Sequence, residues 1–151
     1  MCSGDFACDY ILQSCTLGYG TTWGISIDDV TVSPTNYLGS AWDAFGGAPD
    51  PKVCVWVASD TTSHCTGSAT DVFTTTFLPG VTTTAAPADI AATLGFAVYD
   101  VDVSSDDRVG SCHTTFDSSN PLPTTPLTMT CPVEAATMNS GFTVHYHLSP
   151  Y

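Results

Sequence analysis

The sequence predicts an all-β protein whose antiparallel strands form a sandwich. From Thr21 onward, short runs of β-branched and aromatic residues alternate with clusters of Gly, Pro, Asp and Ser, at intervals that suit sandwich strands. The acidic residues are nearly all Asp, with Glu134 as the one exception, and Asp favours turns and loops over helix surfaces. The sequence shows no internal repeat and no long helical period, so we expect little helix.

Three runs near the middle and end of the chain alternate with the period of two that half-buried strands require. They are "KVCVWVA", "LGFAVYD" and "GFTVHYHLS". Thr143, His145 and His147 occupy the alternate positions of the last run and are expected to face outward. The residues of the last run that are expected to face inward are Phe142, Val144, Tyr146 and Leu148. In the first run Val53, Val55 and Val57 are expected to share one face, and in the second Leu94, Phe96 and Val98 are expected to do so.

An earlier run, "TWGISIDDVTV" at residues 22–32, also alternates but changes phase in its middle. Its two isoleucines lie out of phase with the two valines that follow them. A β-bulge near Asp28 and Asp29 would return all four side chains to one face. We therefore expect a single long strand with a bulge at the two aspartates.

The chain divides into two expected parts. Residues 1–20 form a Cys-rich segment without clear periodicity, and residues 21–151 form the sandwich. Within the sandwich, "DVFTTTFLP" predicts a further strand. The segment "GVTTTAAPADIAA" at residues 80–92 predicts a loop that ends in one short helical turn.

The seven cysteines indicate an oxidising compartment, although reduced, buried cysteines are the alternative. At the N-terminus, two of Cys2, Cys8 and Cys15 could pair and one would be left over. Met1 followed at once by Cys2 is typical of a start codon added to an exported segment, and a first mature Cys also fits a bacterial lipoprotein. The expected location is therefore secreted, cell-surface, periplasmic or lipoprotein-anchored. The pairs close enough in sequence to bridge neighbouring strands are Cys54 with Cys65 and Cys112 with Cys131.

The charge balance argues against a nucleic-acid partner, and the lengths of the apolar runs argue against a membrane-spanning chain. Lys52 and Arg108 are the only basic side chains other than His, and the formal net charge is −13. Binding to nucleic acid requires clustered basic residues that neutralise phosphates, so no nucleic-acid partner is expected. No apolar run approaches the 18 residues that a membrane-spanning helix needs, so the chain is not expected to be transmembrane.

Two acidic segments, "WDAFGGAPDPKVCV" and "VYDVDVSSDDRVG", share one arrangement. Each places a carboxylate at a strand end and another where the chain turns back, and loops of this sort gather at one end of a sandwich. Calcium would explain the crowding of like charges, because it takes six to eight oxygen ligands in irregular geometry. The alternative is a pair of solvated Asp-rich turns. An EF-hand loop is excluded, since Ser105 and Ser111 stand where that loop requires Gly and Glu.

The two segments resemble the first and third calcium-binding loops of C2 domains, which are β-sandwich modules known for calcium-dependent phospholipid binding. The first loop of that family typically reads D, a few small residues, then SDPYVKV, and this chain has "DAFGGAPDPKVCV". The third loop typically reads VYDxD, several residues, then DxxG, and this chain has "VYDVDVSSDDRVG". The resemblance covers residues 23–150. It implies an antiparallel eight-stranded sandwich of circularly shifted topology, in which the family's usual first strand comes last.

Ligand roles are implied residue by residue. Asp106 could replace Asp107, because this third loop is one residue shorter than the common form. Lys52 takes the place of the usual aromatic residue, and the number of calcium ions is left open by these departures. The calcium ligands that the resemblance implies are Asp43, Asp50, Asp100, Asp102 and Asp107.

Two functions follow as expectations. The resemblance implies calcium-dependent association with phospholipid membranes, with Phe45 and Val103 at the loop tips that reach the bilayer. Folding of Phe45 back onto the sandwich is an equal alternative for that residue. The rival function is a calcium-stabilised extracellular structural or adhesion module that binds a protein partner or assembles with itself. Thr-rich faces, the expected disulfides and the small number of charged residues favour this rival function.

An enzyme is the third and weakest class, and none is expected. The sequence has no G-x-S-x-G motif, and "SDTTS" at Ser59 supplies only one of the two aspartates of an aspartic protease. His145 and His147 share a strand face and could bind a transition metal. Two solvent-facing histidines on an outer strand are the alternative for that pair.

Overall fold

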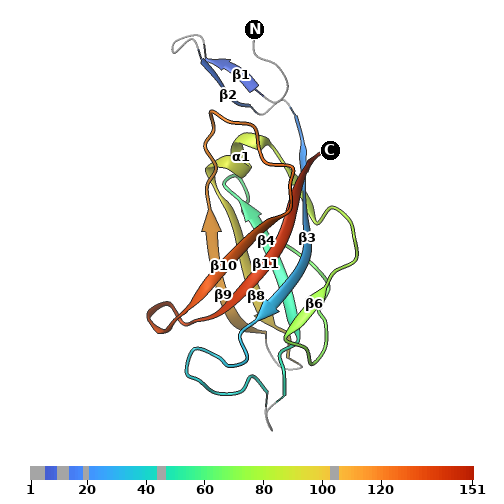
Figure 1. Cartoon of the computed structure of the whole chain (residues 1–151), viewed down its shortest axis with the longest axis vertical. Coiled ribbons are helices and arrows are strands. Elements are labelled where there is room, and N and C mark those ends of the chain that lie inside the picture. The colour runs from blue at the N-terminus through green and yellow to red at the C-terminus, as the bar shows by residue number, and fades with distance from the viewer. Residues whose placement is uncertain (1–5, 10–13, 19–20, 44–46, 103–105) are drawn as a thin grey trace.

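The computed structural model describes residues 6–9, 14–18, 21–43, 47–102 and 106–151, and the statements below concern these residues. They form two packed β-sheets, with a small separate hairpin beside one end (Figure 1). The hairpin consists of β1 (Phe6–Asp9) and β2 (Ser14–Leu17). The all-β expectation is confirmed, since the described helices are α1 (Pro87–Ala92) and the single 3₁₀ turn η2 (Ala135–Thr137).

One sheet contains the first and last long strands of the sandwich. Its strands are β3 (Trp23–Val32), β6 (Thr74–Thr76), β7 (Thr83–Ala85), β10 (Leu127–Glu134) and β11 (Asn139–Pro150). Their order is β10-β11-β3-β6, and β7 pairs with β3 on the same edge as β6. Because β6 and β7 pair with opposite halves of β3, they act as one interrupted edge strand.

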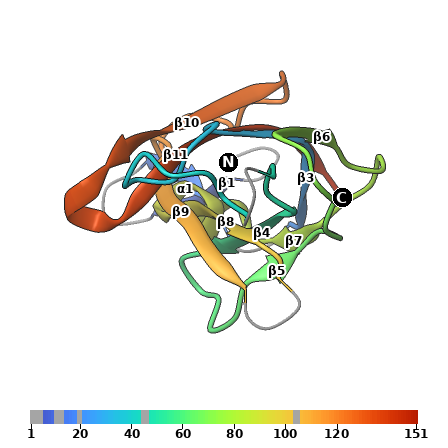
Figure 2. The ribbon, with the colours of Figure 1, turned by 90° about the horizontal axis from the view of Figure 1, so that it is seen from below.

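The second sheet has four strands in the order β5-β4-β8-β9. They are β4 (Pro51–Val57), β5 (His64–Cys65), β8 (Leu94–Asp100) and β9 (Asp107–Thr114). Figure 2 shows the two layers, with β10, β11, β3 and β6 in one and β9, β8, β4 and β5 in the other. With the edge strand β6–β7 counted once, the sandwich has eight strand positions, as the resemblance implies. The circularly shifted topology stays a prediction, and β3 pairs with the closing strand β11.

The core fills the space between the two sheets. Phe96 of β8 and Tyr146 of β11 join the layers, with ring centroids 4.8 Å apart. The residues expected to share a face in each of the three alternating runs are all buried, and the predicted inward face of the last run is confirmed. The largest fully buried side chains are Phe96, Ile25, Ile90, Leu94, Leu148, Val30, Val32, Val53, Val55, Val57, Val98 and Val109.

The predicted bulge in β3 is confirmed. The register pairs His145 with Asp29 and Tyr146 with Ile27, so Asp28 is the extra residue on β3. The bulge returns the apolar side chains on both sides of it to the core. It also places two consecutive acidic residues on the outer face of the sheet.

Three segments differ from the sequence expectations. Residues 80–92, expected as a loop with a helical turn, contain the helix α1 but also the strand β7, whose three residues pair with the open edge of β3. The strand expected in "DVFTTTFLP" is limited to β6. The Cys-rich segment, which was read as having no clear periodicity, contains the hairpin β1–β2, and Phe6 packs against the core. Short strands of three or four residues carry too little periodicity to be read from sequence. The division of the chain at residue 20 stays a prediction.

Both disulfide pairs read from the spacing are present. Cys54–Cys65 joins the neighbouring strands β4 and β5. Cys112–Cys131 joins β9 to β10, which belong to different sheets, so this bridge ties the two layers together along one edge. Cys15 also takes part in a disulfide.

Replacing Cys112 and Cys131 together by Ala should lower the free energy of unfolding by about 3 kcal/mol, because the bridge closes a loop of 19 residues in the unfolded chain. Denaturant unfolding of the oxidised proteins measures this change. The matched variant is C54A/C65A, which opens a loop of 11 residues and should cost about 0.5 kcal/mol less in loop entropy. A loss below about 1 kcal/mol for C112A/C131A would contradict the stabilising role of the inter-sheet bridge.

Candidate metal centre

Backbone contacts bring the two acidic segments together at one end of the sandwich. Asp100 is the last residue of β8, and it lies opposite Pro51, the first residue of β4, in the strand register. The N–H of Val101 donates a hydrogen bond to the carbonyl of Asp50 at 3.1 Å. The N–H of Asp50 in turn donates to the Asp100 carboxylate at 2.6 Å. The end of β8 in the second acidic segment is therefore hydrogen-bonded to Asp50 of the first, the residue just before β4.

Three carboxylates form a compact group there, which we call the Asp trio: Asp43, Asp100 and Asp102. One oxygen from each lies within 4.8 Å of the others. Oxygens bound to one calcium ion are at most about 5 Å apart, twice the bond length of about 2.5 Å, so the spacing suits this ion. The Asp100 side chain is buried, Asp43 is partly buried, and Asp102 is exposed, so the group opens to solvent on one side.

Burial and like charge together disfavour ionisation in the trio. The pKa of Asp100 rises from 3.8 to about 6, first because the carboxyl is buried and then because Asp43, Asp102 and Asp50 repel a further negative charge. The Asp50 N–H opposes this rise by stabilising the ionised form. Burial also raises the pKa of Asp43, with further contributions from the charges of Asp102, Asp50 and Asp71. A bound cation would offset both the cost of burying an ionised carboxylate and the repulsion between the carboxylates.

Asp71 belongs to the surroundings of the trio, and it was not among the predicted ligands. Its N–H donates to the Asp50 carboxylate at 2.6 Å, and its own carboxylate accepts the N–H of Ala48 at 2.9 Å. Its backbone has a positive φ of 53°, a conformation that Asp tolerates better than most residues. Asp71 thus links the first acidic segment to the chain that leads into β6. No repeated spacing or motif letter marks this residue in the sequence.

The two predicted ligands at the end of the second acidic segment, Asp106 and Asp107, are not part of the trio. Asp106 contacts the ammonium group of Lys52, which also lies 5.7 Å from the centre of the Tyr99 ring. Asp107 is the exposed first residue of β9 and lies opposite Asp100 in the register. Their roles as calcium ligands stay predictions. The loop-tip residues Phe45 and Val103 lie outside the described residues.

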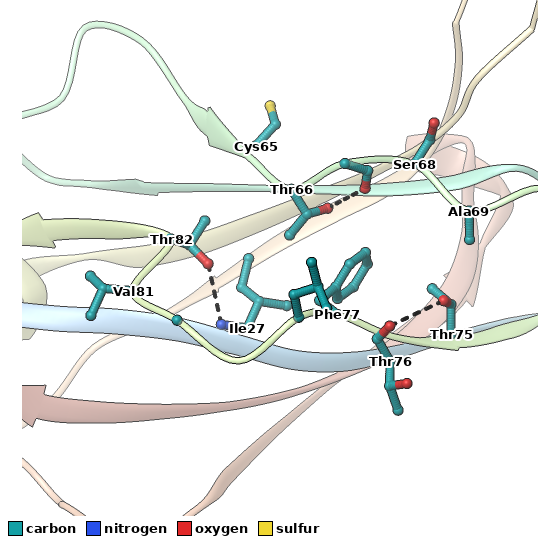
Figure 3. Close-up of a pocket in the computed structure, with 13 residues that line it drawn as sticks. Ile27, Cys65, Thr66, Ser68, Ala69, Thr75, Thr76, Phe77, Val81 and Thr82 are labelled. Atoms are coloured by element: carbon teal, nitrogen blue, oxygen red, sulfur yellow. Dashed lines mark hydrogen bonds between the residues drawn. The ribbon is translucent and has the colours of Figure 1, made fainter.

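A pocket of about 470 Å³ lies apart from the trio, between the segment that follows β5 and the interrupted edge strand β6–β7 (Figure 3). None of its described lining residues is acidic or basic, and Thr66 and Thr82 form hydrogen bonds with nearby backbone groups through their hydroxyl groups. The described helices include none long and apolar enough to cross a membrane.

Comparison with known proteins gives likeness in structure alone. No family model matches the sequence, and neither does any curated protein. A solved C2 domain matches with a TM-score of 0.56 and 17% identity over 86% of this chain and 97% of that one. The C2A domain of a plant extended synaptotagmin 1 matches with a TM-score of 0.59 and 14% identity, over 87% and 95% of the two chains. The calcium-bound C2A and C2B domains of extended synaptotagmin 2 match with a TM-score of 0.57 and 12% identity, and the match spans 86% of this chain and 45% of that one.

The raised pKa of Asp100 predicts a pH dependence of stability in calcium-free buffer. The folded state keeps a proton on Asp100 up to about pH 6, whereas the unfolded chain loses it near 3.8. The contribution of Asp100 to the free energy of unfolding should therefore fall as pH rises from about 4 to about 6. Urea unfolding at a series of pH values measures this decrease, and D100N should show a smaller one. Equal pH slopes for D100N and the unaltered protein would contradict the raised pKa.

Proposed function

Since the chain has the fold of C2 domains, we propose that it is a non-enzymatic module that binds calcium and through calcium associates with phospholipid membranes. The observation that carries this proposal is the Asp trio at one end of the sandwich. Its residues come from two segments far apart in sequence. A cation at their meeting point would offset the repulsion between carboxylates that the fold holds together.

The proposed ligands extend beyond the trio. Asp100 ends β8 and Asp102 lies two residues beyond it, and both would provide the centre of the site, while Asp43 would close it from the first acidic segment. Asp71 adds a further negative charge that acts on Asp43. The full proposed set is Asp43, Asp50, Asp100, Asp102 and Asp107, with Asp106 as the alternative to Asp107.

Charge sets a condition on membrane binding. Each calcium ion adds two positive charges, so two or three ions leave a chain of formal charge −13 at about −9 to −7. An anionic bilayer repels such a body within a Debye length of about 8 Å at physiological salt. The membrane contact would therefore depend on calcium bound at the loops, where the ion can accept lipid phosphate oxygens in its open positions.

The second candidate function is a calcium-stabilised structural or adhesion module of a secreted or cell-surface protein that binds no lipid. The observation that favours it is the pair of disulfides Cys54–Cys65 and Cys112–Cys131, since such bonds persist in oxidising compartments. In this role calcium would hold the loops at one end of the sandwich, as the inter-sheet disulfide holds one edge. A protein partner or a second copy of the chain would then take the place of the membrane.

Calcium at millimolar concentration should raise the melting temperature of the protein by several degrees, because the ion binds the folded trio and has no such site in the unfolded chain. Scanning calorimetry with calcium and with chelator measures the shift. D100N/D102N should show almost no shift. D117N is the control, since Asp117 hydrogen-bonds Ser119 and Asn120 in its own turn and should leave the calcium shift intact. If the unaltered protein has the same melting temperature with calcium and with chelator, the proposed calcium site is wrong.

Sedimentation with liposomes separates the two candidate functions. Vesicles of phosphatidylserine and phosphatidylcholine should pull the protein down in calcium and release it when chelator is added. D100N/D102N should stay in solution in both conditions, while D117N should behave like the unaltered protein. If the protein shows the calcium shift in melting temperature but never sediments with these vesicles, the structural module is the correct function.

A further inference from the structure

Two histidine–aspartate pairs lie side by side on the outer face of the sheet that contains β3 and β11. His145 Nδ1 lies 2.6 Å from an oxygen of Asp29, and His147 Nδ1 lies 2.9 Å from an oxygen of Asp28. We call these four residues the His–Asp patch. It lies on the face opposite the core, since the residues that alternate with the two histidines are buried.

The bulge in β3 creates this arrangement. In a regular strand, consecutive side chains point to opposite faces, so only one of two adjacent aspartates could reach the histidines. Asp28 is the extra residue of the bulge, and both Asp28 and Asp29 therefore contact imidazoles on the same face. Each of the two histidines of β11 is therefore hydrogen-bonded to a different aspartate of β3.

The hydrogen bonds select one tautomer of each imidazole. A carboxylate accepts the proton of Nδ1–H, which leaves the lone pair on Nε2. This is the arrangement in which histidines bind metal ions, because a carboxylate partner fixes the ring and raises the basicity of the free nitrogen. The side chains of His145 and His147 are 45% and 41% exposed, so both rings are accessible to an ion from solvent.

The spacing of the two histidines suits a single ion. Residues two apart on one strand share a face and are separated by about 6.7 Å along the strand. Zinc–nitrogen bonds of about 2.0–2.1 Å place two nitrogens about 3.4 Å apart around a tetrahedral ion. His145 and His147 share the outer face of β11, so a single ion that binds both requires their rings to turn toward one another.

We propose that the His–Asp patch binds a divalent transition-metal ion of the zinc and copper class through Nε2 of His145 and His147. Water fills the remaining coordination positions, and Asp28 and Asp29 orient the rings without binding the ion. Imidazole nitrogens favour this class of ion, whereas the all-oxygen Asp trio favours calcium. The net charge of −13 also attracts cations to the surface.

Titration with Zn²⁺ in the presence of saturating calcium tests the proposal, because calcium then competes for the Asp trio. Calorimetry should show one zinc ion bound to the unaltered protein, and the variant H145Q/H147Q should lose this binding. H64Q and H113Q remove the other two histidines of the chain and should leave it unchanged. D28N/D29N keeps both imidazoles but removes their carboxylate partners, so its zinc affinity should fall by about 10–100-fold.

A spectroscopic measurement shows which atoms bind. With one equivalent of Cu²⁺, electron paramagnetic resonance should show hyperfine coupling to two imidazole nitrogens in the unaltered protein and in D100N/D102N, and none in H145Q/H147Q. Melting curves without added metal establish that H145Q/H147Q is folded, as expected for substitutions of outward-facing side chains. Zinc binding that persists in folded H145Q/H147Q, or that disappears in H64Q or H113Q, would overturn the proposal.

Discussion

The carboxylate of Asp100 is the group around which the loop end of the sandwich is arranged. It is buried at the end of β8, it accepts a hydrogen bond from the N–H of Asp50, the residue before β4, and it lies near other carboxylates. Without a cation, burial of the carboxyl and, after it, repulsion from the neighbouring carboxylates raise its pKa to about 6. Asp100 therefore connects the two acidic segments through its hydrogen bond with Asp50, but its ionised carboxylate is unfavourable in that position. A calcium ion would reconcile these two effects, because it favours the ionised carboxylates that the fold brings together.

Much of the fold could be predicted because the long strands carry strong periodic patterns. The alternation in β4, β8 and β11 identified the buried face of each strand, and the change of phase in β3 identified a bulge at Asp28 and Asp29. The short strands β6 and β7 could not be predicted in the same way, because three residues do not show a period. Their position depends on the free edge of β3, which is a property of the folded sheet.

The candidate site shows the same limit. Asp43, Asp100 and Asp102 were found from two local segments that resemble known loops, and the structure brings all three together. Asp71 was missed because it reaches the site through the path of the chain after β5, and its contacts to Asp50 and Ala48 have no local sequence signal. The contact between Asp106 and Lys52 likewise depends on the pairing of distant strands. Contacts of this kind join residues that are far apart in the sequence, so no local sequence pattern predicts them.

A crystal structure grown with calcium tests the central claim most directly. Anomalous scattering should show a calcium peak bonded to oxygens of Asp43, Asp100 and Asp102, at distances of about 2.3–2.6 Å. The absence of a peak at the trio, in crystals grown near pH 7 with millimolar calcium, would contradict the account. The carboxylates would then be held together by the fold and by hydrogen bonds from backbone N–H groups alone.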